Sequence, residues 1–198
     1  MTKHRVLVMC LVLMTGGVTL AWAGEPTEKI KATTDKILGV VRDPALKGAA
    51  KEKERRALIR KAVDERFDWN EMARRSLARH WEGRTEDEKK EFVPLYADLV
   101  DRAYMSKVEG YSGEKVKYEG ETVDGDYATV NVRIMTQKGQ EISVEYRLRK
   151  KGNDWLIYDV SIEGVSLVNN YRTQFNSIIS QSSYASLVKQ LKTKVASN

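Results

Sequence analysis

The residues best suited to acid–base chemistry in this chain are His80 and Asp159. No cluster of acidic or thiol ligands surrounds His80 in the sequence, which favours a structural or exposed histidine. Asp159 could act as a general base if burial raised its pKa; the alternative is a hydrogen-bonded carboxylate near a strand end. The sequence contains no HExxH, P-loop, GxSxG or GxGxxG motif. We therefore predict a protein that is not an enzyme and has no catalytic residue, metal site or cofactor.

A second chemical feature is a run of cations near the end of a predicted strand, formed by Arg147, Arg149, Lys150 and Lys151. The run has no interleaved aromatic platform, so nucleic acid is not expected as a partner. We predict that this run binds a partner protein. The net charge of +6 suits anionic partners, but ordinary solubility explains it equally well.

The first 23 residues have the pattern of a secretory signal peptide. Lys3 and Arg5 precede an apolar stretch over residues 6–18, and Ala21-Trp22-Ala23 places small residues where a signal peptidase reads. The alternative is a membrane anchor, but the apolar stretch is short for a bilayer of about 30 Å. Cleavage after Ala23 leaves one domain, residues 24–198, with a net charge of +4 and no cysteine. Its stability must then come from a packed core without disulfides.

Helical periodicity dominates the chain before residue 110 and after residue 165. One apolar stripe ends at Asp43-Pro44, and a second, made of Leu58, Ile59, Ala62 and Val63, follows within a highly charged segment. Asp68 with Glu71, and Thr85 with Glu88, have the spacing of capping boxes. Pro94 lies inside the helix that follows Thr85, and we expect it to kink or interrupt that helix within a turn.

Between residues 116 and 162 the apolar period changes to two, which is typical of strands. Turn sequences around Gly125, Gly139 and Gly152 separate four strands, so an antiparallel meander is expected. The strands alternate apolar and polar residues, which means that one sheet face is covered and the other is wet. The fold class predicted is α+β, with a curved four-stranded antiparallel sheet covered on one face by helices.

The covered face is the best candidate for a ligand pocket. The candidate lining residues are apolar positions of the strands and of the helices that face them: Leu99, Tyr104, Val108, Val130, Val132, Ile134, Val144, Tyr146, Leu148, Val160, Ile162, Val168, Tyr171 and Phe175. Periodicity identifies a buried face without showing whether the space behind it is filled, so ordinary core remains the alternative for each of them.

Two segments of the chain resemble a known family. The segment YDVSIEGVSLVNNYRTQF, starting at Tyr158, is similar to the C-terminal signature of the MlaC family, also called the toluene-tolerance Ttg2 family. A second segment, FDWNEMARRSLARHW at residues 67–81, is similar to another stretch of that family. The resemblance covers nearly all of the chain after residue 24. One departure is Ala78, where the family is expected to favour glycine before Arg79.

The resemblance implies a periplasmic phospholipid-binding protein of the Mla pathway of Gram-negative bacteria. It implies an NTF2-like cone in which sheet and helices enclose a pocket for acyl chains. It also implies an outer-membrane lipoprotein–porin complex and an inner-membrane ABC transporter complex as partners. A monomer that shuttles a glycerophospholipid between them is the expected function. The alternatives are a carrier of another lipid such as a hopanoid, a periplasmic enzyme acting on a lipid-like substrate, and an adaptor with a solid core.

Overall fold

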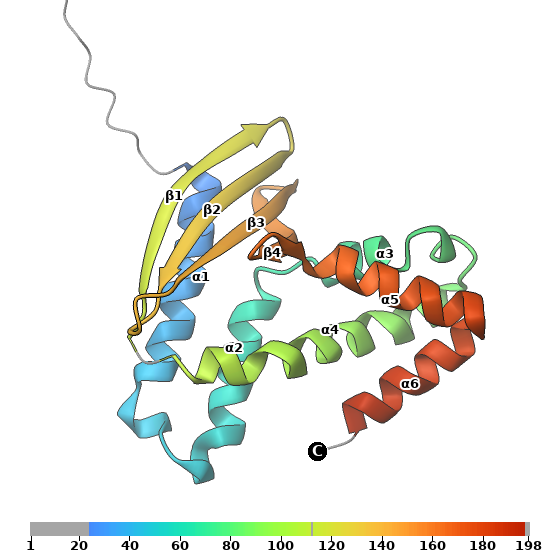
Figure 1. Ribbon diagram of the computed structural model, residues 1–198, viewed down its shortest axis with the longest axis horizontal. Coiled ribbons are helices and arrows are strands. Elements are labelled where there is room, and N and C mark those ends of the chain that lie inside the picture. Colours follow the sequence, from blue (N-terminus) through green and yellow to red (C-terminus); the bar gives the residue numbers. More distant parts are fainter. Residues whose placement is uncertain (1–23, 112, 197–198) are drawn as a thin grey trace, which may run out of the picture.

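A computed structural model describes residues 24–111 and 113–196 (Figure 1). The predicted signal peptide and its cleavage site lie outside these residues. Among the described residues, no helix is both long enough and apolar enough to cross a membrane. The elements in chain order are α1 (Glu25–Arg42), α2 (Glu52–Asp64), α3 (Trp69–Leu77), α4 (Glu86–Glu109), β1 (Lys115–Asp124), β2 (Tyr127–Met135), β3 (Glu141–Lys151), β4 (Asp154–Ile162), β5 (Val165–Ser166), α5 (Leu167–Gln181) and α6 (Tyr184–Ala196). Short 3-10 turns at Pro44–Leu46, Ala49–Lys51 and Ala78–His80 connect or extend the helices.

The strands form one antiparallel sheet in the order β1-β2-β3-β4-β5, so the predicted α+β class and meander are confirmed. The prediction of four strands was one short. Val165 and Ser166 form a fifth, because Glu163 and Gly164 both have positive φ angles and close a tight hairpin that returns the chain onto β4. A two-residue strand has no periodicity that a sequence could reveal.

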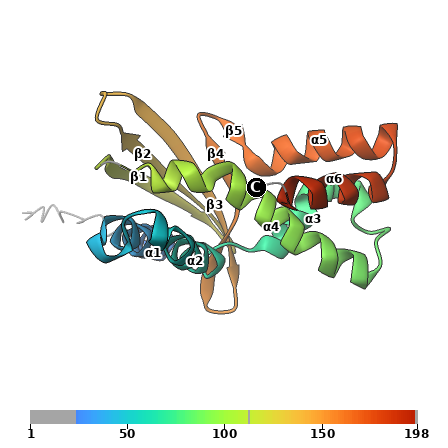
Figure 2. The ribbon, with the colours of Figure 1, turned by 90° about the horizontal axis from the view of Figure 1, so that it is seen from below.

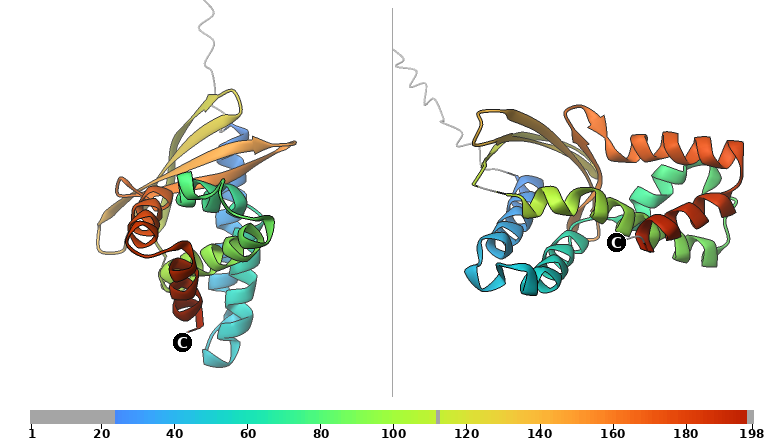
Figure 3. Two further views of the ribbon diagram at one scale, coloured as in Figure 1. Left: turned by 90° about the vertical axis from the view of Figure 1, so that its right-hand side faces the viewer. Right: turned by 60° about the horizontal axis from the view of Figure 1, so that its bottom comes forward.

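The helices fall into two groups (Figures 1 and 2). The helices α1 and α2 lie side by side under one face of the curved sheet. A helical end formed by α3, α5, α6 and the first half of α4 lies beyond β4. The second half of α4 runs from that end back toward α1 and α2 (Figure 3). The helix α4 therefore belongs to both groups.

The caps that start the helices explain several boundaries. Ser166 accepts a hydrogen bond from the N–H of Asn169 and begins α5, and Thr85 forms the predicted capping box with Glu88. Asp68 accepts from the N–H of Glu71 at 3.2 Å and begins α3. The reciprocal bond predicted for Glu71 is not formed, because its carboxylate is engaged by Arg74 and Arg75 instead.

Pro94 was expected to kink or interrupt its helix, and the interruption was wrong, because α4 runs unbroken from Glu86 to Glu109. A proline removes one backbone hydrogen bond, and the packing of α4 against α3 and α6 holds the helix together on both sides of that position.

Candidate functional site

A cavity of about 210 Å³ lies between the sheet and the helices α1, α2 and α4. Its wall is almost wholly apolar. The lining residues from the helices and the segments next to them are Ile30, Thr33, Thr34, Ile37, Ile59, Val63, Phe67, Trp69, Val100, Asp101, Tyr104, Met105, Val108 and Leu167, and those from the sheet are Tyr146, Ile157, Val160 and Ile162. An enclosed apolar wall with few polar groups is typical of a ligand pocket.

The second half of α4 forms one side of this cavity. Val100, Tyr104 and Val108 follow one another at intervals of four residues, which places them on one helix face above the cavity. The helix continues to Glu109, where arginines of α2 hold its end. Arg55 donates to Glu109 at 2.7 Å and 3.0 Å, and Arg56 donates to it at 2.9 Å. This side of the cavity is thus closed partly by ion pairs between α2 and α4.

Three polar side chains of the wall have partners within the protein. The hydroxyl groups of Thr33 and Thr34 donate to carbonyl groups one turn earlier in α1. Asp101 faces the guanidinium of Arg60 at 4.0 Å, and burial raises its pKa above the usual range even though Arg60 opposes the shift. Burial also raises the pKa of Tyr146 to about 12, although part of its surface borders the cavity. The wall thus offers an apolar ligand no unpaired charge.

The predicted lining residues divide between this cavity and the solid core. Five of them line the cavity: Tyr104, Val108, Tyr146, Val160 and Ile162. The other nine pack in the core away from it: Leu99, Val130, Val132, Ile134, Val144, Leu148, Val168, Tyr171 and Phe175.

Most residues of the cavity wall belong to helices for which the sequence predicted only that they cover the sheet. Ile30 and Ile37 of α1, Ile59 and Val63 of α2, and Met105 of α4 all line the cavity. The apolar stripes of α1 and α2 were visible in the sequence. Which stripe faces a space and which faces a close neighbour depends on the distance between elements, which periodicity does not encode.

The two candidate acid–base residues lie outside the cavity. Asp159 is 4% exposed and accepts from the N–H groups of Val160 and Val168 and from the hydroxyl of Ser166, as the hydrogen-bonded alternative expected. His80 lies 3.1 Å from the side-chain oxygen of Asn176 on α5. Neither residue is placed to act on a ligand held in the cavity.

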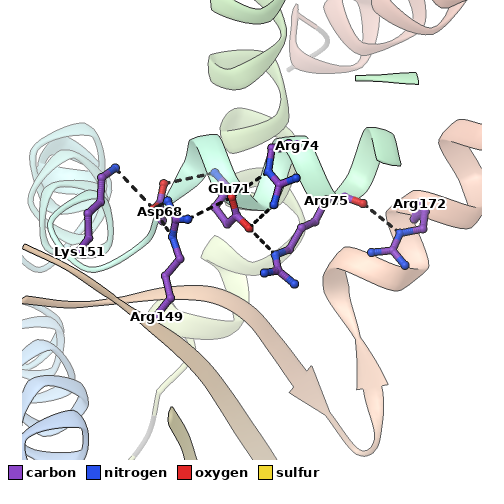
Figure 4. A network of polar contacts seen from close by, with 7 residues as sticks. All are labelled: Asp68, Glu71, Arg74, Arg75, Arg149, Lys151 and Arg172. Atoms are coloured by element: carbon purple, nitrogen blue, oxygen red, sulfur yellow. Dashed lines mark hydrogen bonds and ion pairs between the residues drawn. The ribbon is translucent and has the colours of Figure 1, made fainter. Parts of the chain in front are cut away.

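The basic run of β3 is largely committed to holding α3 (Figure 4). Arg149 donates to the buried carboxylate of Asp68 at 2.7 Å and 3.0 Å, and the ammonium of Lys151 lies 3.5 Å from the same oxygen. Lys150 lies over the ring of Trp155. Arg147 bonds Glu145 and lies 3.7 Å from Asp159.

Glu71 is the second carboxylate of this network. Its side chain is 5% exposed and bonds Arg74 and Arg75 at 2.6–2.9 Å, with Arg149 at 3.4 Å. Burial opposes ionisation, but the guanidinium groups outweigh it and lower the pKa of Glu71 to about 2. Asp68 and Glu71 together therefore tie α3 to β3. Within residues 24–111 and 113–196, no group of three or more His, Cys, Asp or Glu side chains is placed to hold a metal ion.

A curved sheet and helices that border an apolar cavity are typical of a protein that binds an apolar ligand. Comparison with known proteins gives the family. Residues 31–193 match the family described as MlaC protein, and the chain belongs to that family, as its resemblance predicted.

The chain is also similar to individual proteins. The chain is 19% identical over 121 residues to the intermembrane phospholipid transport system binding protein MlaC of Haemophilus influenzae, and the match spans 59% of this chain and 56%, about half, of that relative. It shares its fold with a phospholipid-binding protein from Ralstonia solanacearum, solved in complex with a phospholipid, at a TM-score of 0.78 and 22% identity over 87% of this chain and 98% of that one. A structure named as a putative NTF2-like transpeptidase from Campylobacter jejuni matches at 18% identity over 68% of this chain and 97% of that one, with a TM-score of 0.42, which is too low to bear on the fold.

Proposed function

We propose that this protein carries a glycerophospholipid with its acyl chains in the cavity between the sheet, α1, α2 and α4. The observation that carries the proposal is the cavity itself, which lies in the interior of a chain of the MlaC family and has an almost wholly apolar wall. The solved relative from Ralstonia solanacearum binds a phospholipid, which supports the same ligand class here. No step of this function requires catalysis.

The physical need for a carrier is the cost of exposing acyl chains to water. Burial of each CH₂ group contributes about 0.8 kcal/mol, so a chain of about fifteen such groups gains on the order of 12 kcal/mol by leaving water. The charged headgroup stays at the rim, because burying it unpaired costs several kcal/mol. This partition of tail and headgroup sets the orientation of the bound lipid.

The cavity must widen to hold a lipid. Its volume of about 210 Å³ is below the roughly 300–1,000 Å³ typical of pockets that enclose drug-sized ligands. The second half of α4 is the part of the wall best placed to move, since ion pairs from Arg55, Arg56 and Arg60 connect it to α2. The side chains of these pairs are 12–48% exposed, so water can replace the ion pairs, and this side opens at a smaller cost than a packed apolar face.

The setting of this carriage is also part of the proposal. A signal peptide cleaved after Ala23 would deliver a monomer to the periplasm. There it would exchange lipid with an outer-membrane lipoprotein–porin complex and an inner-membrane ABC transporter complex. Tight burial of the tails makes spontaneous release slow, so these partners are expected to open the pocket. The run Arg147, Arg149, Lys150 and Lys151 stays our candidate for a partner contact, and within it Arg147 and Lys150 contact residues of the sheet, whereas Arg149 and Lys151 hold Asp68 at the start of α3.

Mass spectrometry of lipid extracted from the purified protein tests the proposal. We expect a glycerophospholipid in near-stoichiometric amount. Val63→Phe places a larger side chain against the cavity and is expected to lower the bound amount several-fold with little change in Tm. Val123→Phe is the matched control, since Val123 is 50% exposed on β1.

Each outcome has a clear meaning. Protein that is always empty and takes no lipid from vesicles would contradict the proposal. Equal lipid content in Val63→Phe and Val123→Phe would show that the lipid lies elsewhere. A hopanoid as the extracted ligand would keep the carrier function and change the ligand class.

A further inference from the structure

A second hollow of about 260 Å³ opens beside β4 and the start of α5, and arginines dominate its wall. Arg75 comes from α3, Arg147 from β3 and Arg172 from α5, and the remaining wall includes Tyr158, Asp159 and Asn169. We call it the arginine hollow. Three elements that are far apart in the sequence thus bring three guanidinium groups to one place.

The sheet separates the arginine hollow from the apolar cavity. Arg147 pairs with Asp159 across β3 and β4, and Tyr146 pairs with Val160 in the next register position. Because neighbouring residues of a strand point to opposite faces, the first pair faces the hollow and the second faces the cavity. A ligand of the hollow is therefore not the headgroup of a lipid whose tails fill the cavity.

Each guanidinium is held in place through its Nε atom. Arg75 donates from Nε to Glu71 at 2.6 Å, and its guanidinium lies 4.1 Å from the ring centroid of Tyr158. Arg172 donates from Nε to the backbone carbonyl of Arg75 at 2.9 Å (Figure 4). Among the described residues, Arg172 forms no ion pair with a carboxylate. The terminal N–H groups of Arg75 and Arg172 therefore remain available to a ligand.

Asp159, the carboxylate of this wall, is already occupied. It accepts from two backbone N–H groups and from the Ser166 hydroxyl at 2.6–3.1 Å, and it lies 3.7 Å from Arg147. The N–H of Asn169 is capped by Ser166, so the start of α5 is satisfied internally and is not itself the site. The wall of the hollow thus holds three cations and one anion, and Glu71 and Glu145, which are not part of the wall, pair with the Nε atoms of Arg75 and Arg147.

The charge and geometry favour a tetrahedral dianion. A phosphate monoester carries a charge of about −1.5 to −2 at neutral pH and offers three terminal oxygens, whereas a carboxylate is planar and pairs with a single guanidinium fork. We propose that the arginine hollow is a binding site for a phosphate group, either inorganic phosphate or a phosphate monoester. The source is a soluble phosphate or a monoester headgroup exposed at a membrane surface. This proposal does not depend on the proposed lipid cavity.

The test is a titration at constant ionic strength, followed by NMR of the arginine side-chain Nε–H signals in the full protein. Inorganic phosphate and glycerol 3-phosphate are expected to shift the signals of Arg75, Arg147 and Arg172 saturably. Dimethyl phosphate, a singly charged diester, is expected to bind more weakly. Arg172→Gln should weaken phosphate binding about tenfold or more, since it removes charge-assisted hydrogen bonds. Lys138→Gln makes the same charge change at an exposed turn and should leave the affinity unaltered.

A flotation assay then distinguishes the two sources. Binding to vesicles that contain phosphatidate, stronger than to vesicles of equal charge made with phosphatidylglycerol and lost in Arg172→Gln, supports the membrane source. Binding of soluble phosphate alone supports the soluble source. The proposal is overturned if no phosphate saturates the signals, if Lys138→Gln weakens binding as much as Arg172→Gln, or if acetate or an acidic peptide binds more tightly than phosphate. The apo Tm of each variant shows that it is folded.

Discussion

The apolar cavity and the helical end of the molecule both consist mainly of apolar residues but are packed differently. In the helical end, Phe92, Tyr96, Tyr171 and Phe175 contact one another with ring centroids 5.5–6.3 Å apart, and each is at most 8% exposed. In the cavity, Val100, Tyr104 and Val108 of the same helix α4 face open space. One helix therefore has a solid half and a half that borders a hollow.

The difference shows what creates a binding site in this fold. Large rings from α4 and α5 fill the space at one end and stabilise it by burial and edge-to-face contact. At the other end the facing residues are mostly aliphatic, and ion pairs connect α4 to α2. The packed rings make the helical end rigid, and the unfilled space at the other end leaves room for a ligand.

The largest expected effect comes from removing a ring of the solid end. Phe175 is 2% exposed, and its substitution by alanine should lower the free energy of unfolding by about 3–5 kcal/mol, because it removes contacts on all sides and leaves a cavity. Ile162→Ala, at the wall of the existing cavity, should cost only about 1 kcal/mol, since one side of that residue has few partners to lose. Urea denaturation measures both values. Equal costs would show that the two ends are packed alike.

The junction between the two ends should give the next largest effect. Glu71→Gln leaves the arginines around it without their partner and should cost about 2–3 kcal/mol of stability. Glu65→Gln is the control, because Glu65 pairs only with exposed Lys36.

Glu71 also predicts a pH dependence. Its pKa falls from 4.5 to about 2 on folding, so its contribution is complete above pH 4.5 and is lost as the pH falls toward 2. The contribution is at most about 3 kcal/mol. The unfolding free energy of the native protein should therefore decrease over this range more steeply than that of Glu71→Gln. Parallel pH curves for the two proteins would contradict the role given to this carboxylate.

A smaller effect is expected where α4 is attached to α2 over the cavity. Glu109→Gln removes the charge that Arg55 and Arg56 share, and should cost about 1–2 kcal/mol. The same change should speed transfer of a fluorescent phospholipid from vesicles into the protein, because α4 then opens more readily. Glu54→Gln, which breaks only an exposed pair with Lys51, should leave the transfer rate unchanged. An unchanged rate in Glu109→Gln would mean that the lipid enters by another route.

The smallest effect concerns the turn that ends α3 in the solid end. Ala78 has φ 48° and ψ −121°, a region that L-residues rarely adopt and that glycine adopts freely. Ala78→Gly should raise stability by about 1 kcal/mol, whereas Ala57→Gly on the exposed face of α2 should lower it by a similar amount. A lower Tm for Ala78→Gly would show that the backbone relaxes at this turn.

The strain at Ala78 was foreseeable, because it is the position where the chain departs from the expected glycine. The caps could also be predicted: Asp68 and Thr85 begin α3 and α4 as their spacing indicated, since capping depends on residues three apart in the chain. The alternation of apolar and polar residues along the strands likewise predicted the sheet and its covered face. These features are local, so the sequence contains them.

The features that could not be predicted from the sequence are those that depend on the distance between helices and strands in space. Tyr171 and Phe175 had the helical spacing of a buried face, but their rings fill the solid end instead of lining the cavity. Arg149 was expected to be a surface cation that contacts a partner. It instead donates to the buried carboxylate of Asp68, which lies eighty-one positions earlier in the chain. Such contacts depend on how α3, α5 and the sheet come together, and periodicity along one element carries no information about that.

The most direct test of the account is photocrosslinking with a phospholipid that carries a photoreactive group at the end of one acyl chain. We predict that the label attaches to the peptides that contain Tyr104 and Val108 of α4 and Ile162 of β4. Attachment mainly to the α5 peptide that contains Tyr171 and Phe175 would contradict it, because the acyl chain would then occupy the end of the molecule that we describe as solid.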